Sequence, residues 1–229
     1  MRKTAAMVAF AAAAIALNAP AQAQDMAGTV QVKVLGTAVL PDGNMKEVKF
    51  VSDDIAAALP SEFNTKADNN YVPTLAVEYF LTSNISVETI CCVTQHDVTG
   101  TGGLEGAELV SNAKIIPATL TAKYHLPLNA PIKPYIGAGA TYWFIFDEKP
   151  GTTAAALGVA DTDVKDGFGA VLQAGFDVPL NEKFGLSFDA KKYFINRTAS
   201  FYDASDTLVL KTKHDLDPWL LSAGVSYRF

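Results

Sequence analysis

The sequence is poor in charged residues, in histidine and in cysteine, and each shortage removes a class of function. Lys and Arg number 18 against 24 Asp and Glu, a formal net charge of -6, so the clustered positive charge that nucleic-acid phosphates require is lacking. Cys91 and Cys92 are neighbours. On a strand their side chains would point to opposite faces, where a mutual disulfide would distort the backbone. We expect no nucleic-acid partner, no metal and no cofactor.

Long apolar runs are also scarce. Ala5 to Leu17 is apolar but too short to span a bilayer, follows two basic residues and precedes the small-x-small pattern Ala21-Gln22-Ala23. This order is typical of a secretory signal peptide, which we predict for residues 1–23, with residues 24–229 forming a single domain. Beyond the signal no stretch of about eighteen apolar residues occurs, so no transmembrane helix is predicted.

What the sequence does contain is alternation of apolar and mixed residues, repeated eight times. A period of two is the signature of a β-strand, and these segments exceed the usual strand length of about 5 to 6 residues. The segments are 30–35, 74–81, 85–93, 118–126, 135–146, 168–178, 184–194 and 219–229.

The connections between these segments alternate in length. Short connections at 82–84, 127–130 and 181–183 alternate with long ones at 41–71, 96–112, 147–165 and 200–214. Short periplasmic turns and long outer loops are typical of bacterial outer-membrane barrels. We therefore predict an all-β protein, an eight-stranded antiparallel transmembrane β-barrel in contact with membrane lipids and lipopolysaccharide, with both termini in the periplasm. Ser52-Asp53-Asp54 in the first long connection predicts a short helix that ends by Pro60.

A soluble lipocalin-like barrel would show the same period, with its apolar side chains inside. Two features favour the membrane barrel. Glycines lie on the mixed side, where a narrow interior needs small residues, at 137, 139, 169, 175, 185 and 224. Aromatic residues lie on the apolar side near segment ends, as in membrane-interface girdles: Tyr79, Tyr124, Phe184 and Tyr227 at one end, Tyr142, Phe144, Phe168 and Trp219 at the other.

The mixed side carries four charged residues of each sign if it faces inward. Opposite charges in a narrow lumen are expected to pair, because an unpaired buried charge is unfavourable. We predict that they plug the periplasmic half of the barrel: Lys33, Glu78, Glu88, Lys123, Asp177, Asp189, Lys191 and Arg228.

The same inward side is apolar toward the long connections. We predict there an apolar cup that admits a hydrophobic ligand, formed by Leu35, Ile90, Trp143, Ile145, Tyr193, Ile195 and Leu220. The alternative is that these residues only pack beneath the folded loops.

Several motifs together resemble the outer membrane protein W (OmpW) family of eight-stranded barrels. They are Asn84-Ile85-Ser86-Val87-Glu88, Pro117-Ala118-Thr119-Leu120, Lys133-Pro134-Tyr135-Ile136-Gly137-Ala138-Gly139, Lys165-Asp166-Gly167-Phe168-Gly169 and Leu216-Asp217-Pro218-Trp219 with the closing Tyr227-Arg228-Phe229. The resemblance implies a narrow apolar passage for small hydrophobic molecules, with lateral exit into the membrane. It also implies that Tyr227 and Phe229 belong to an assembly signal, with the barrel-assembly machinery and periplasmic chaperones as partners.

An enzyme in the barrel is the competing class of function. Catalysis needs a nucleophile or base with an orienting partner. His96-Asp97 and His214-Asp215 fit solvated loops, His125 points into the barrel, and the hydrolase, zinc-protease and phosphate-loop motifs do not occur. We expect no enzyme activity. The alternative to transport is a structural protein or surface receptor with a closed, packed lumen.

Overall fold

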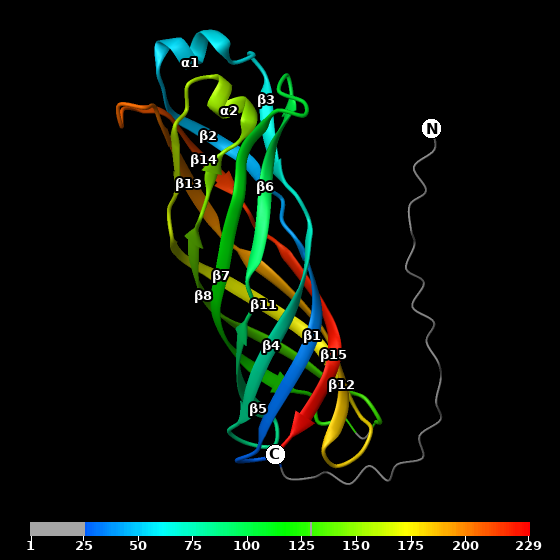
Figure 1. Cartoon of the computed structure of the whole chain (residues 1–229). Coiled ribbons are helices and arrows are strands. Elements are labelled where there is room, and N and C mark those ends of the chain that lie inside the picture. Colours follow the sequence, from blue (N-terminus) through cyan, green and yellow to red (C-terminus); the bar gives the residue numbers. More distant parts are fainter. Residues whose placement is uncertain (1–25, 129) are drawn as a thin grey trace, which may run out of the picture.

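The computed structural model describes residues 26–128 and 130–229, and its main element is a closed antiparallel barrel (Figure 1). The predicted signal peptide, residues 1–23, lies outside the described residues. All eight alternating segments are strands, which confirms the predicted fold. The barrel strands are β1 (Val30–Leu40), β4 (Asn70–Phe80), β5 (Ile85–Cys91), β7 (Glu108–His125), β8 (Lys133–Phe146), β11 (Gly167–Pro179), β12 (Phe184–Phe194) and β15 (Trp219–Arg228).

The barrel closes through its first and last strands. β1 pairs with β15 from Gln31 opposite Arg228 to Leu40 opposite Trp219, and β7 pairs with β8. Each barrel strand thus has a partner on both sides, so the barrel has no free edge that could pair with another chain. The three short connections lie together at one end, which we call the turn end (Figure 1).

Alternation along the strands sorts side chains between lipid and lumen. On β7, Leu120 is 58% exposed whereas the next residue, Thr121, is 1% exposed. Because lipid tails are apolar, the apolar side of each strand faces outward and the mixed side faces inward. The predicted aromatic residues also gather on the outside: Tyr142 contacts Phe144 and Phe168 with ring centroids 4.8 Å apart.

The four long connections were predicted as loops, and this prediction is wrong. β13 follows β12 after a single residue, Ile195, so barrel strands continue past the membrane and pair again beyond it. We call this region the distal cap. It contains β2 (Asn44–Val51), α1 (Asp53–Ala58), β3 (Phe63–Ala67), β6 (Thr94–Gly102), β9 (Lys149–Pro150), α2 (Thr152–Ala156), β10 (Asp161–Val164), β13 (Asn196–Tyr202) and β14 (Leu208–Asp215).

The distal cap has two sheets. β10, β13, β14 and β2 form one four-stranded sheet, whereas β6 and β3 extend the barrel sheet by pairing along the far half of β7. α1 confirms the predicted short helix. Neither helix in the described part of the chain has the length and apolar character needed to cross a membrane. The cap therefore roofs the barrel at the end opposite the turns (Figure 1).

Candidate functional site

Charged side chains in the turn-end half of the lumen form one buried network. Glu88 on β5 is its centre: its carboxylate oxygens lie 3.2 Å from Lys33 Nζ, 2.9 Å from Lys123 Nζ and 3.0 Å from Lys191 Nζ. Glu78 lies 2.8 Å from both Lys33 and Lys123. Five barrel strands, β1, β4, β5, β7 and β12, thus contribute to one set of ion pairs, which we call the charge network.

Two aspartates complete the charge network. Asp189 Oδ1 lies 2.7 Å from Lys191 Nζ, and Asp177 Oδ1 lies 3.6 Å from Lys33 Nζ. Three lysines therefore face four carboxylates. The predicted eighth member, Arg228, is placed differently: its guanidinium donates to the amide oxygen of Gln31 at 3.3 Å and forms no ion pair with a described residue. Arg228 is only partly buried, because it ends β15 at the rim of the barrel.

Neutral residues that the sequence reading missed fill the gaps between these charges. Gln173 Nε2 donates to Glu88 Oε1 at 2.9 Å and to Asp189 Oδ2 at 2.6 Å. Tyr135 donates to Asp189 Oδ2 at 2.8 Å, and its ring lies 3.7 Å from Lys123 Nζ. The alternation already places both residues on the inward side of their strands, but neither carries a formal charge that would mark it as a member of the network.

Gly175 makes room for Tyr135. The two residues are opposite each other in the pairing of β8 with β11, and a Cβ at position 175 would lie 2.5 Å from Tyr135 Oη. That separation is far below van der Waals contact, so any side chain at 175 would displace the phenol from Asp189. The glycines on the inward side thus let large polar residues pack across the lumen.

Ser86, His125 and Glu78 lie together at the turn end and contain the residue types of a catalytic triad. Ser86 Oγ and Glu78 Oε1 approach the same imidazole nitrogen, Nε2 of His125, at 2.9 and 2.8 Å. In a triad the serine and the acid use different nitrogens, so that the acid orients the base. Ser86 is also fully buried. This cluster therefore belongs to the charge network and lacks the geometry of a hydrolase.

The charge network predicts that removing a buried ammonium destabilises the barrel. In Lys123→Met, Glu78 and Glu88 lose one of the two cations that bridge them and keep only Lys33, which should lower the free energy of unfolding by about 3 to 5 kcal/mol. Lys114→Met is the matched control. Lys114 lies on the same strand and contacts Asp147 at 2.7 Å, but this pair is exposed, so the loss should stay below about 1 kcal/mol. Urea unfolding from lipid vesicles measures both. Equal stabilities would indicate a hydrated, open lumen.

The apolar residues predicted as a cup lie above the charge network. Leu35, Ile90, Trp143, Tyr193, Ile195 and Leu220 belong to one buried cluster, and Ile145 packs against it. The rings of Trp143 and Tyr193 are 6.0 Å apart. The lower members of the cluster pack against one another, whereas Trp143, Ile145, Tyr193 and Leu220 also line a cavity above them.

This cavity extends from the barrel into the distal cap and is lined mainly by apolar side chains. It offers about 120 Å³ to the centres of water-sized molecules. That space is well above what a single water needs, roughly 10 to 15 Å³. Val98, Val110, Phe201 and Leu210 form its cap side. A small aromatic molecule or a short alkyl chain fits this volume.

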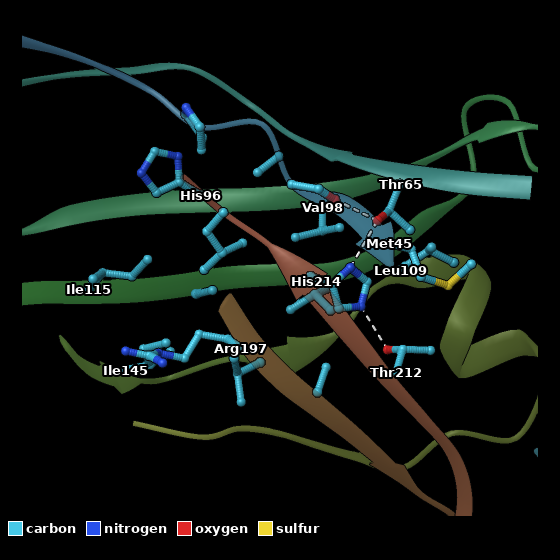
Figure 2. Close-up of a pocket in the computed structure, with 18 of the residues that line it drawn as sticks. Met45, Thr65, His96, Val98, Leu109, Ile115, Ile145, Arg197, Thr212 and His214 are labelled. Carbon is cyan, nitrogen blue, oxygen red and sulfur yellow. Dashed lines mark hydrogen bonds between the residues drawn. The ribbon is translucent and has the colours of Figure 1, made fainter. Parts of the chain in front are cut away.

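Two histidines line the cavity, and the sequence-based placement of both on solvated loops is wrong. His96 is 4% exposed; its Nδ1 lies 2.7 Å from Asp68 O and its Nε2 lies 2.9 Å from Thr94 Oγ1. His214 lies between Thr65 Oγ1 at 3.0 Å and Thr212 Oγ1 at 2.7 Å (Figure 2). Pairing between distant segments encloses both rings, which no local pattern reveals.

Burial favours the neutral form of both imidazoles. Desolvation by burial lowers the pKa of His96, and it lowers the pKa of His214 to about 4. Thr65 donates its hydroxyl hydrogen to Gly43 O at 2.6 Å, so it accepts from Nδ1–H of His214. Thr212 then donates to Nε2. The polar groups around these histidines satisfy one another and leave the cavity uncharged there.

The lowered pKa of His214 predicts that the stability of the distal cap depends on pH. In the unfolded chain the His214 imidazole binds a proton below pH 6.5, whereas in the folded cap it does so only near pH 4. The contribution of His214 to the stability of the cap is therefore complete above about pH 6.5 and is lost as the pH falls from 6.5 to 4. Over this pH range the free energy of unfolding of the cap should fall by about 3 kcal/mol. Hydrogen exchange of the β2 and β14 amides between pH 6.5 and 4 measures this fall. His214→Gln should remove most of the step. An unchanged step in that variant would assign it to other groups.

The residues predicted to guide assembly lie at the turn end. The rings of Tyr227 and Phe229 are 4.8 Å apart, and Phe184 contacts Tyr227 at 5.0 Å. Phe229 is 73% exposed, and its amide donates to Val30 O at 2.9 Å. The end of the chain is thus fixed to the first strand while its aromatic side chain remains accessible.

Comparison with known proteins places this architecture in a family. The model of the OmpW family matches residues 26–229, which covers every barrel strand. The chain belongs to the OmpW family. The uncharacterized outer-membrane protein y4mB of Sinorhizobium fredii is 32% identical over 232 residues, covering 98% of this chain and 93% of that protein. The barrel described here is accordingly an outer-membrane protein that sits in the lipid bilayer.

A solved structure and a named relative extend the comparison. The crystal structure of the outer membrane protein OprG from Pseudomonas aeruginosa superposes with a TM-score of 0.76 at 27% identity, covering 89% of this chain and 97% of that one. The dibenzothiophene metabolism operon protein PahQ of Pseudomonas aeruginosa is 30% identical over 132 residues, 58% of each chain.

Proposed function

We propose that this OmpW-family protein takes up small hydrophobic molecules through the cavity between barrel and cap. The observation that carries the proposal is an apolar cavity placed directly above a lumen filled with paired charges. Apolar pockets of this kind bind ligands by removing apolar surface from water. The relative named for dibenzothiophene metabolism supports this ligand class, because dibenzothiophene is a compact apolar aromatic molecule.

The charge network bars an apolar molecule from moving straight down the barrel, so we infer a sideways exit. The β5–β7 ladder ends at Ile90 opposite Thr119, and the β6–β7 ladder begins at Thr94 opposite Ile115. Residues 116–118 of β7 have no ladder partner on that side in the described chain. Pro117 lies in this break, lacks an N–H to donate and lines the cavity. A bound molecule there is separated from lipid by an incompletely bonded wall.

Uptake by this route requires the cap to face the outside of the cell and the turns to face the periplasm. Glu105 lies in the turn after β6 in the cap, and Glu182 lies in a short connection at the turn end; both are exposed. In a background without Cys91 and Cys92, Glu105→Cys should react with a membrane-impermeant maleimide on intact cells, and Glu182→Cys should react only after lysis. The reverse pattern would invert the orientation.

Filling the cavity tests the proposed function. Ala113 on β7 is 7% exposed and lines the cavity, so an indole in Ala113→Trp would occupy the ligand space. We expect the affinity for naphthalene to fall at least tenfold, about 1.4 kcal/mol, with a matching loss of uptake into liposomes.

Ala122→Trp is the matched control, because Ala122 lies on the same strand but faces outward. It should bind and transport naphthalene like the parent. If Ala113→Trp folds and also behaves like the parent, the cavity is not the site and the structural or receptor role takes its place.

A further inference from the structure

Two buried nitrogens in the cavity wall have no hydrogen-bond acceptor among the residues that the structure describes. Nε of Arg197 and Nε1 of Trp143 are both without a hydrogen-bond partner, and the two residues are only 9% and 4% exposed. Buried donors nearly always have partners, and an unpaired one is unfavourable, more so when it is charged. Both residues line the cavity, and Figure 2 shows Arg197 there.

Register places the two side chains next to each other. Gly167 is directly opposite Trp143 in the pairing of β8 with β11. A Cβ at Gly167 would lie 3.2 Å from the nearest terminal nitrogen of Arg197, so the guanidinium occupies the position where a side chain at 167 would stand. Residues opposite one another on one face of an antiparallel pair have Cβ atoms about 4.5 to 5.5 Å apart. The guanidinium therefore lies at the strand position opposite Trp143.

Backbone carbonyls fix the rest of the guanidinium. One terminal nitrogen donates to Asn196 O at 2.6 Å, and the other donates to Gly167 O and, at 3.1 Å, to Phe168 O. These bonds hold the group rigidly in the wall and leave the Nε–H edge free. A donor group held in this way is preorganised for an acceptor.

The positive charge of Arg197 has no anionic partner among the described residues. No carboxylate forms an ion pair with it, and the nearby Asp166 is exposed and accepts the amide of Ile145 at 2.8 Å. The other polar groups of the cavity, around His96 and His214, are neutral and already paired. One buried cation thus stands in the wall of an otherwise apolar cavity.

We propose that the cavity is built for apolar molecules that carry a single carboxylate, such as aromatic or short fatty acids. The carboxylate accepts hydrogen bonds from Arg197 Nε–H and Trp143 Nε1–H, and the apolar body extends toward Val98 and Phe201. This inference rests on the proposed function and narrows its substrate class. A hydrogen bond that involves a charged group contributes more than a neutral one, so the acid is favoured over a neutral molecule of the same shape.

The test compares 2-naphthoate, 2-naphthamide and naphthalene on the folded, full-length barrel by calorimetry at neutral pH. The parent should bind naphthoate at least tenfold more tightly than naphthamide. Arg197→Met, which keeps much of the side-chain bulk without the charge, should weaken naphthoate about 30-fold and naphthalene less than threefold. Trp143→Phe should weaken naphthoate and naphthamide several-fold more than it weakens naphthalene, because only the first two present an acceptor to the indole N–H.

Two results would overturn the inference while leaving the proposed function intact. One is a parent that binds naphthalene and naphthamide as tightly as naphthoate. The other is an Arg197→Met variant that loses affinity for all three probes equally, as expected if Arg197 only clamps the strands. If Arg197→Met does not fold, the relative affinities of the parent for the three probes are sufficient to test the inference. A parent that binds none of the probes would contradict the proposed function itself.

Discussion

Burial of paired charges in a narrow lumen is the constraint on which the rest of the structure depends. Eight strands enclose only enough space for their own side chains, so ionic groups placed inside must satisfy one another. Glu88 contacts three lysines, and Gln173 and Tyr135 donate hydrogen bonds to carboxylates of the same network. A buried network of ion pairs and hydrogen bonds thus crosses the turn-end half of the lumen. We propose that this network stops an apolar molecule from continuing along the axis.

The distal cap encloses the space above the charge network. Strands such as β7 and β13 extend beyond the membrane and pair there, so they surround the space above the cup residues. The result is a cavity whose floor is packed, whose roof is a second sheet and whose side wall is incompletely bonded at Pro117. This arrangement is consistent with the proposed route, in which a molecule enters through the cap and leaves sideways into lipid.

Local pattern was enough to predict the barrel but not the cap. Period-two alternation is read directly from the sequence, and it placed Lys33, Glu78 and Glu88 inside and Leu120 outside. The cap depends on pairing between segments far apart in the chain, such as β2 with β14, and no local pattern encodes that contact. His214 next to Asp215 therefore suggested a solvated loop, whereas the paired strands half-bury the ring between Thr65 and Thr212. Arg228 was wrongly predicted to form an ion pair, because the alternation along a strand shows which way a side chain points but not how deep in the lumen it lies.

Ion conductance across a planar bilayer tests the closed axis most directly. If the charge network fills the lumen, the reconstituted protein should carry naphthalene into vesicles without raising the ion conductance of the bilayer above that of a protein-free membrane. Ions need a continuous hydrated path along the barrel, whereas an apolar molecule that leaves sideways does not. A steady single-channel ion current through the unmodified protein would contradict the closed axis, because it would show that water and ions pass the paired lysines and carboxylates.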